Sequence, residues 1–161
     1  FEPGRGFGVA SAFGGVMGMA ICNDRRWPET YRVMALQGAE LVCVGYNTPD
    51  DHTGVFDFDQ LTGFHHQLSL QAGAYQNATW VAAAAKAGCE EGSNMIGLSM
   101  IVAPSGQIVS MASTTSDEVI TARCDLDMGV LYKRTIFDFA RHREPSQYGL
   151  IVERKGPVVE V

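Results

Sequence analysis

The chain has 161 residues, 46% of them hydrophobic and 19% charged, and it carries a formal net charge of −6 at pH 7. These proportions are typical of one globular domain and exclude a disordered polymer. The negative charge and the lack of a basic block argue against nucleic acid or an anionic membrane surface as a partner, and no apolar run approaches the roughly 18–20 residues of a membrane span.

The first third of the chain predicts a strand, a helix and a second strand. Residues 1–14 are rich in glycine and are expected to form a loop with room for a short edge strand. Residues 16–22 predict a short, mostly buried strand, and residues 28–38 predict a helix with a proline in its first turn and a glycine at its end. Residues 40–44 are apolar without alternation, which predicts a strand buried on both faces. The inner stripe of the helix is expected at Trp27, Tyr31 and Met34.

The rest of the chain continues the alternation of helices and strands. Residues 59–75 predict a long helix, because apolar residues recur there every three or four positions, at Leu61, Phe64, Leu68, Ala72 and Tyr75. The other expected elements are loops at 45–57 and 86–97, a strand at 80–85, a hairpin of 98–103 with 107–112, a half-exposed strand at 118–125, a helix at 127–139 and an extended tail at 145–161. Helices that alternate with largely buried strands indicate an α/β fold.

A nucleophile is predicted where the first buried strand ends, at Cys22. A strand that fixes the thiol, a turn that exposes it and the positive end of a following helix together favour a reactive thiolate. Arg25 and Arg26 follow three and four positions later, and adjacent guanidinium groups suit a substrate that carries a carboxylate. The alternatives are an inert core cysteine and arginines in surface salt links. The polar run Asn-Asp-Arg-Arg directly after the cysteine cannot belong to a core, and it favours the catalytic interpretation.

Two further pairs of residues are candidates for the site. Asn47 and Thr48 come just after the second buried strand, where binding sites in α/β sheets collect. From the residues alone, a turn in which both bond their own backbone is the stronger interpretation. His65 and His66 lie on neighbouring faces of the long helix, and we interpret them as hydrogen-bonded residues of a core or interface rather than as catalytic groups.

The cysteines and histidines indicate neither a disulfide framework nor a metal centre. The cysteines, at positions 22, 43, 89 and 124, form no CxxC pair, which is typical of free thiols in a reducing, cytoplasmic compartment. The histidines, at positions 52, 65, 66 and 142, show no zinc-type spacing with them. We therefore expect no metal and no other cofactor.

The run Ile-Cys-Asn-Asp-Arg-Arg-Trp-Pro-Glu at 21–29 resembles the cysteine motif of the nitrilase, or carbon–nitrogen hydrolase, superfamily. Further segments are similar to its N-carbamoyl-D-amino acid amidohydrolase (D-carbamoylase) branch, at residues 1–4, 45–49, 64–66, 71–73, 75–77, 101–104, 117–121 and 147–151. The resemblance implies a four-layer α-β-β-α sandwich. Family members are about twice this long, so it also implies that residues 1–161 are the C-terminal part of a single such domain, with the N-terminal half absent.

The resemblance further implies a Glu-Lys-Cys triad, of which only Cys22 lies on a matching position. The glutamate and the lysine of the family lie upstream of residue 1, and no lysine of this chain matches. In the implied reaction, Cys22 attacks the ureido carbonyl of a small N-carbamoyl amino acid, and the backbone N–H of Asn23 helps to hold the oxyanion.

Arg25 and Arg26 would then hold the substrate carboxylate in a pocket lined by Asn47 and Thr48. The family also suggests a homo-oligomer. The alternatives are another amidase or ureidopropionase of the superfamily and a non-catalytic module that has kept half of the fold.

Overall fold

The computed structural model describes residues 2, 4–51 and 54–158. Residues 52–53 of the predicted 45–57 loop, residues 159–161 of the predicted tail, and His52 lie outside the described residues. The strands are β1 (Val9–Ala12), β2 (Gly15–Ile21), β3 (Leu41–Tyr46), β4 (Trp80–Ala85), β5 (Cys89–Glu90), β6 (Ser93–Asn94), β7 (Met100–Val102) and β8 (Ile108–Met111). The helices are η1 (Cys22–Arg26), α1 (Pro28–Leu36), α2 (Phe56–Gln60), α3 (Thr62–Asn77), α4 (Met128–Lys133), α5 (Phe139–His142), η2 (Pro145–Gln147) and α6 (Gly149–Glu153).

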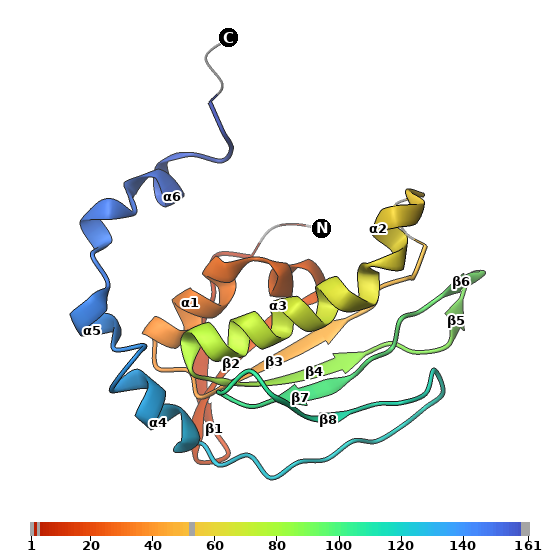
Figure 1. Cartoon of the computed structure of the whole chain (residues 1–161), viewed down its shortest axis with the longest axis horizontal. Helices are drawn as coiled ribbons and strands as arrows, with labels where there is room; N and C mark the ends of the chain where they lie inside the picture. The colour runs from red at the N-terminus through yellow and green to blue at the C-terminus, as the bar shows by residue number, and fades with distance from the viewer. Residues whose placement is uncertain (1, 3, 52–53, 159–161) are drawn as a thin grey trace.

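One mixed sheet organises the fold, with strand order β1-β2-β3-β4-β7-β8 (Figure 1). Strands β2, β3 and β4 are parallel, and the outer pairs are antiparallel. In this register Ile21 lies opposite Gly45, and Gly45 lies opposite Ala84, so the carboxyl ends of the parallel strands meet at one edge of the sheet. The predicted α/β class is confirmed, as are the predicted edge strand before β2 and the hairpin that forms β7 and β8.

Helices α1 and α3 cover one face of the sheet and enclose the core (Figure 1). The helices approach closely because Gly73 of α3 leaves room for the ring of Tyr31, whose Cζ would lie 2.6 Å from a Cβ at position 73. Tyr31 and Met34 are buried, as predicted. The prediction for Trp27 is wrong, since it is 58% exposed: it precedes Pro28 in an extended conformation and does not share the inner face of the helix. The buried core side chains are Ala20, Tyr31, Met34, Ala39, Val42, Val44, Tyr46, Leu70, Ala74, Val81, Ala83, Met100 and Val102.

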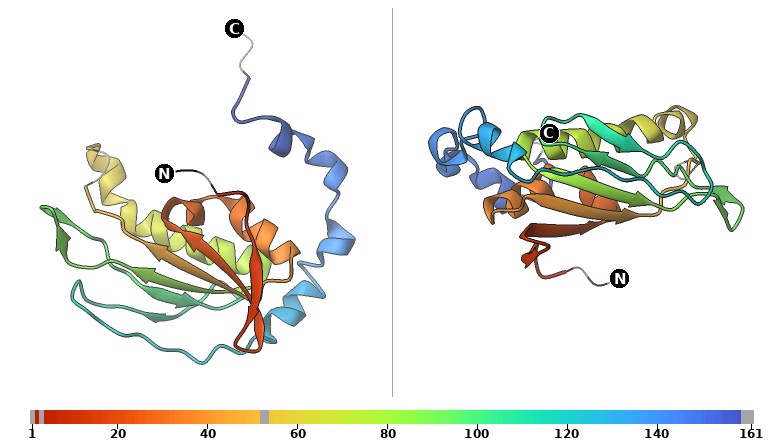
Figure 2. Two further views of the ribbon diagram at one scale, coloured as in Figure 1. Left: turned by 180° about the vertical axis from the view of Figure 1, so that it is seen from behind. Right: turned by 90° about the horizontal axis from the view of Figure 1, so that it is seen from below.

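The opposite face of the sheet is largely uncovered (Figure 2). On β2, Met19 is 76% and Ile21 71% exposed, while Ala20 between them is buried against the helices. On β3, Val42 and Val44 are buried but Cys43 is only half-buried. The prediction that residues 40–44 are buried on both faces is therefore wrong for one face, because the described chain places no layer over it.

The long predicted helix at 59–75 is two helices, α2 and α3, separated at Leu61. The apolar stripe that predicted the helix does not form the core. Phe64 and Leu68 are exposed, and α3 instead buries Thr62, His66, Leu70, Gly73, Ala74 and Asn77. The chain therefore presents an apolar helix stripe to its surroundings.

The C-terminal third differs most from expectation. Residues 118–125 alternate between exposed and half-buried as predicted, but they form no strand because no neighbouring strand pairs with them. The helix predicted at 127–139 is instead two helices, α4, which ends at Lys133, and α5. The predicted extended tail contains the short helices η2 and α6, and the predicted loop at 86–97 contains the β5–β6 hairpin. Trp80 Nε1 donates to the Asp125 carbonyl (2.7 Å) and fastens this segment, while η2 and α6 extend away from the sheet (Figures 1 and 2).

Candidate active site

The predicted site residues come together at the edge where the parallel strands end. Cys22 follows β2 directly, Asn47 follows β3, and Lys86 follows β4. The thiol of Cys22 lies 3.8 Å from the carbonyl oxygen of Asn47, to which it donates. The strand register alone explains this convergence, because equivalent strand ends lie side by side in a parallel sheet.

Cys22 occupies a strained backbone position. Its φ is +50°, in the left-handed region that non-glycine residues rarely adopt, at a cost of about 1–3 kcal/mol. It begins η1, and the Asp24 carboxylate accepts from the backbone N–H of Ile21 (3.0 Å) across the turn. At the C-terminal end of η1, the backbone N–H of Trp27 donates to the Asp24 carbonyl (3.2 Å). Such strain persists only where surrounding contacts enforce it, and it is frequent at catalytic residues.

Arg25 is buried beneath this turn, with 1% of its surface exposed, so the prediction that the polar run after Cys22 cannot belong to a core is wrong for this residue. Its Nη1 donates to the Cys22 carbonyl (2.7 Å) and its Nη2 to Thr48 Oγ1 (3.0 Å). Its guanidinium carbon lies 4.4 Å from the centre of the Tyr46 ring. Burial, and secondarily the charge of Arg26, lowers the pKa of Arg25. In the part of the chain that the structure describes, no carboxylate forms an ion pair with Arg25.

The third contact of the Arg25 guanidinium determines the state of His66. Arg25 Nε can only donate, and it lies 3.2 Å from His66 Nδ1, so Nδ1 must be the acceptor. His66 is therefore neutral with its proton on Nε2, which lies 2.8 Å from Tyr46 Oη and 3.2 Å from the Leu98 carbonyl. Burial, and then the charge of Arg25, lowers the pKa of His66 to about 4. The prediction that His66 is a hydrogen-bonded core residue is confirmed.

Arg26 and Asn47 lie on the exposed side of the same edge. Arg26 forms no ion pair among the described residues. Asn47 Nδ2 donates to Glu90 Oε2 (2.8 Å), and Glu90 also forms an ion pair with Lys86. The bonds from Lys86 and Asn47 lower the pKa of Glu90. The sequence interpretation missed Lys86 and Glu90 as neighbours of the site, although Lys86 directly follows a strand parallel to β2.

The predicted substrate ligands thus fall into two groups. Arg25 and Thr48 are buried and bond one another, so neither offers a polar atom to a ligand at the surface. Arg26 and Asn47 are exposed, and Asn23 is exposed as the second residue of η1. Of the predicted ligands among the described residues, Arg26, Asn47 and Asn23 are therefore the exposed ones.

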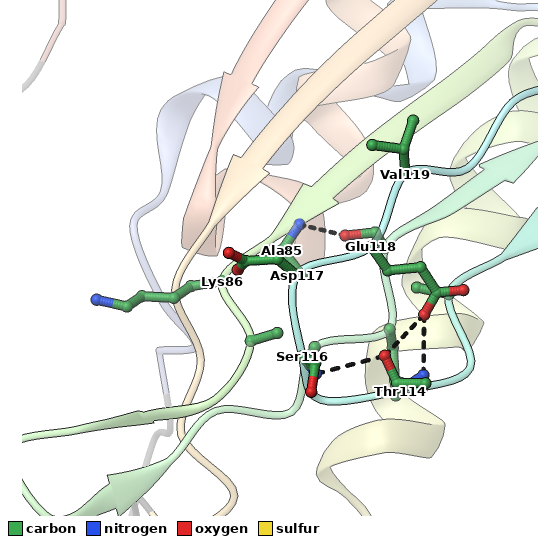
Figure 3. A pocket seen from close by; sticks show the side chains of 12 residues that line it. Ala85, Lys86, Thr114, Ser116, Asp117, Glu118 and Val119 are labelled. Carbon is green, nitrogen blue, oxygen red and sulfur yellow. Dashed lines mark hydrogen bonds between the residues drawn. The ribbon is translucent and has the colours of Figure 1, made fainter.

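A separate cleft of about 530 Å³ opens beyond the end of β4 (Figure 3). The Glu118 carboxylate accepts from Thr114 N and Thr114 Oγ1 at its rim, and Ala85 N–H donates to Ser99 Oγ (2.9 Å). These polar groups satisfy one another, and Cys22 does not line this cleft. Within the described ranges, no three His, Cys, Asp or Glu side chains are placed to hold a metal ion. No described helix has the length and apolarity to cross a membrane.

Comparison with known proteins identifies the family. The chain matches the carbon-nitrogen hydrolase family over residues 1–134. It belongs to this family. As a carbon-nitrogen hydrolase, it is 28% identical over 148 residues to a probable nitrilase of Schizosaccharomyces pombe, covering 92% of this chain and 51% of the relative. It is 32% identical over 169 residues to N-carbamoylputrescine amidase of Arabidopsis thaliana, covering 97% of this chain and 54% of the relative.

Solved structures of carbon-nitrogen hydrolases have the same fold. The Helicobacter pylori G27 enzyme matches with a TM-score of 0.83 at 24% identity, over 96% of this chain and 55% of that one. A mutant amidase from Nesterenkonia matches with a TM-score of 0.65 at 25% identity, over 88% of this chain and 50% of that one. The active-site cysteine of that amidase carries the acetamide moiety of fluoroacetamide. The chain spans about half the length of these relatives. The superfamily resemblance of the 21–29 motif is confirmed, whereas these relatives do not single out the D-carbamoylase branch.

Proposed function

We propose that this chain is the C-terminal part of a carbon-nitrogen hydrolase domain and supplies the nucleophile for hydrolysis of N-carbamoyl-D-amino acids. The observation that carries the proposal is the strained Cys22 beside two arginines, neither of which forms an ion pair among the described residues. The two guanidinium groups outnumber the one carboxylate of the turn, Asp24, and this net positive charge next to a nucleophile attracts an anionic substrate and repels a cationic one. It therefore favours a substrate with a carboxylate over N-carbamoylputrescine, which ends in an ammonium group.

In the proposed reaction, the Cys22 thiolate attacks the ureido carbonyl carbon and forms a C–S bond. The oxyanion accepts from the backbone N–H of Asn23 and from the lysine that the family resemblance places upstream of residue 1. The C–N bond to the amino acid breaks as the leaving nitrogen takes a proton. Water then attacks the carbamoyl thioester with help from the family's glutamate, the thiolate leaves, and the carbamate decomposes to carbon dioxide and ammonia.

Arg26 and Asn47 are the proposed ligands of the substrate carboxylate. Both are exposed at the strand edge that carries Cys22, and a guanidinium grips a carboxylate through two parallel hydrogen bonds. The choice of D rather than L substrates rests on the resemblance of the motifs at 21–29 and 45–49. We assign Arg25 and Thr48, which bond one another in the interior, to the support of Cys22 rather than to the carboxylate.

The proposal also includes a homo-oligomer in a reducing, cytoplasmic compartment. The four cysteines are free, which supports such a compartment. The exposed Phe64 and Leu68 of α3, together with the bare sheet face at Met19, leave apolar surface that a second subunit or the rest of the domain would cover. Light scattering coupled to size-exclusion chromatography tests the oligomer, and a monodisperse monomer contradicts it.

The test compares three substrates of different charge on the protein, including any upstream segment that its gene encodes. N-carbamoyl-D-alanine, its L enantiomer and N-carbamoylputrescine are assayed by ammonia release. Arg26→Ala should raise KM for the D-amino acid roughly 10- to 150-fold, the loss expected for a charge-assisted hydrogen bond of about 1.5–3 kcal/mol. Arg123→Ala, at an exposed arginine of the 118–125 segment, is the control and should leave KM unchanged.

Each failure has a distinct meaning. Faster turnover of N-carbamoylputrescine than of N-carbamoyl-D-alanine would assign the chain to an amine-specific amidase. Equal turnover of the two enantiomers would remove the D assignment alone. No turnover of any of the three would favour a different amidase substrate or a non-catalytic module.

A further inference from the structure

A buried guanidinium without a carboxylate is a costly feature that needs an explanation. Moving a charge out of water is unfavourable unless hydrogen bonds replace its hydration. Arg25 meets this requirement with neutral acceptors alone, namely the Cys22 carbonyl, Thr48 Oγ1 and His66 Nδ1, and with the face of Tyr46. These four groups occupy the donors and one face of the buried guanidinium, so we look for the role of Arg25 in the structure of the protein rather than in ligand binding.

The acceptors belong to three separate parts of the fold. The Cys22 carbonyl belongs to the turn η1, Thr48 follows β3, and His66 lies in the middle of α3. The guanidinium is rigid and planar, so its donors cannot move independently of one another. Contacts with β3 and α3 therefore fix the position of Nη1, and Nη1 fixes the carbonyl of Cys22 at 2.7 Å.

The bond to Cys22 acts on the residue that is strained. At φ +50°, the Cys22 backbone would relax toward negative φ without an opposing contact. That relaxation would rotate the Cα–Cβ bond and move the sulfur away from the substrate. A misplacement of about 1 Å is enough to reduce a rate by roughly 100-fold.

We propose that Arg25 is a positioning residue: anchored by Thr48 and His66, it holds the Cys22 carbonyl and thereby keeps the nucleophile in its left-handed backbone conformation. This role rests on the proposed function, because it assumes that Cys22 is the attacking group. It differs from the sequence-based prediction, in which Arg25 and Thr48 touch the substrate carboxylate. Loss of a carboxylate ligand raises KM, whereas loss of a support for the nucleophile lowers kcat.

Thr48 is the best position at which to test the proposal, because Arg25 variants are at risk of not folding. Thr48→Val keeps the shape of the side chain and removes the acceptor for Arg25 Nη2, whereas Thr48→Ser keeps the oxygen. Thr79→Val is the matched control, because Thr79 is a second buried threonine. It lies before β4, at the opposite end of the parallel strands from Thr48, and its hydroxyl has no partner among the described residues. All variants are compared with the unaltered protein, including any upstream segment that its gene encodes.

The readouts are kcat, KM and the rate at which iodoacetamide alkylates Cys22 at pH 7. Peptide mass spectrometry measures the alkylation, with Cys89 as an internal reference because it is an exposed thiol outside the network. Thr48→Val should lower kcat and the ratio of Cys22 to Cys89 alkylation by about 10- to 100-fold and change KM less than about 2-fold. Thr48→Ser should recover most of both losses, and Thr79→Val should reproduce the unaltered protein.

His66 gives an independent arm of the same experiment. His66→Asn keeps an acceptor near the position of Nδ1, whereas His66→Leu removes it. The alkylation ratio should fall further in His66→Leu than in His66→Asn when both are measured well below their unfolding temperatures.

The outcomes separate this role from its alternatives. A rise in KM at unchanged kcat in Thr48→Val would place Thr48 on the substrate and overturn the proposal. A folded Thr48→Val protein with a lower unfolding temperature and an unchanged alkylation ratio would show a merely structural network, which also overturns it. If no substrate is turned over, the proposed function fails, but the alkylation ratio still decides whether Arg25 positions Cys22.

Discussion

Replacement of the buried His66 by asparagine should remove the loss of stability that this side chain causes at acid pH. His66 is 1% exposed, and the groups that face it are the Arg25 guanidinium from η1, the Tyr46 hydroxyl from β3 and the carbonyl of Leu98, with Arg26 as a further nearby charge. Burial and the charges of Arg25 and Arg26 favour the neutral ring, whereas the hydrogen bond to the Leu98 carbonyl favours the protonated one. The folded protein therefore resists protonation of a group that the unfolded chain protonates readily.

The direction and the size of this change in stability with pH follow from the pKa values of His66 in the unfolded and folded states. Its pKa is lowered from 6.5 to about 4 by burial and by Arg25. Between these values the unfolded state binds the proton and the folded state does not, so the stability present above pH 6.5 is lost as pH falls toward 4. Each tenfold change in proton affinity is worth about 1.4 kcal/mol, so the complete loss is about 3 kcal/mol, most of it reached by pH 4.5.

The measurement is urea unfolding followed by far-ultraviolet circular dichroism at pH 7.5, 6.0 and 4.5. Asparagine does not titrate, so the stability difference between the unaltered protein and His66→Asn should shift by about 2–3 kcal/mol in favour of the variant as pH falls from 7.5 to 4.5. Contributions of other titrating groups cancel in that difference. A difference that stays constant across this range would refute a neutral, buried His66 and the tautomer assigned to it.

Two pairs of variants test the nucleophile and the core. Cys22→Ala should abolish turnover, as measured by ammonia release. Cys43→Ala should retain turnover at some cost in stability, because burial raises the pKa of the Cys43 thiol and makes it a poor nucleophile. Activity in Cys22→Ala would contradict the assignment. Gly73→Ala should lower the free energy of unfolding by about 1–3 kcal/mol, because its methyl group would overlap the Tyr31 ring. Gly63→Ala in the same helix would make only ordinary contacts and should raise the free energy of unfolding by up to about 1 kcal/mol. Equal effects of the two changes in urea unfolding would contradict this packing.

The elbow at Cys22 could be predicted because its signals are local. An apolar strand, a polar run and a proline at the start of the helix are contiguous in the sequence, and β2, η1 and α1 form there, although Met19 and Ile21 of the strand are exposed. The carboxyl-edge placement of Asn47 was predictable for the same reason, since the order of strand and helix determines which ends of a parallel pair coincide.

The opposite surroundings of Arg25 and Arg26 could not be predicted. They are identical adjacent residues, and only the tertiary partners of Arg25 distinguish them: His66 lies 41 positions away and Thr48 lies 23 positions away. Residues 118–125 show in the same way that a local pattern does not reveal tertiary partners. Their alternation is real, but a strand also needs a neighbour, and a sequence pattern does not supply one.

The two tryptophans of the chain lie in opposite surroundings, and this gives the protein an intrinsic optical probe. Trp80 is buried with its indole N–H bonded to the Asp125 carbonyl, so its emission should be blue-shifted and protected from iodide. Trp27 directly follows η1 and is largely exposed, so its emission should be red-shifted and quenched. A ligand that covers the elbow beside Cys22 would shield Trp27 alone, and Trp80 would serve as the reference within the same spectrum.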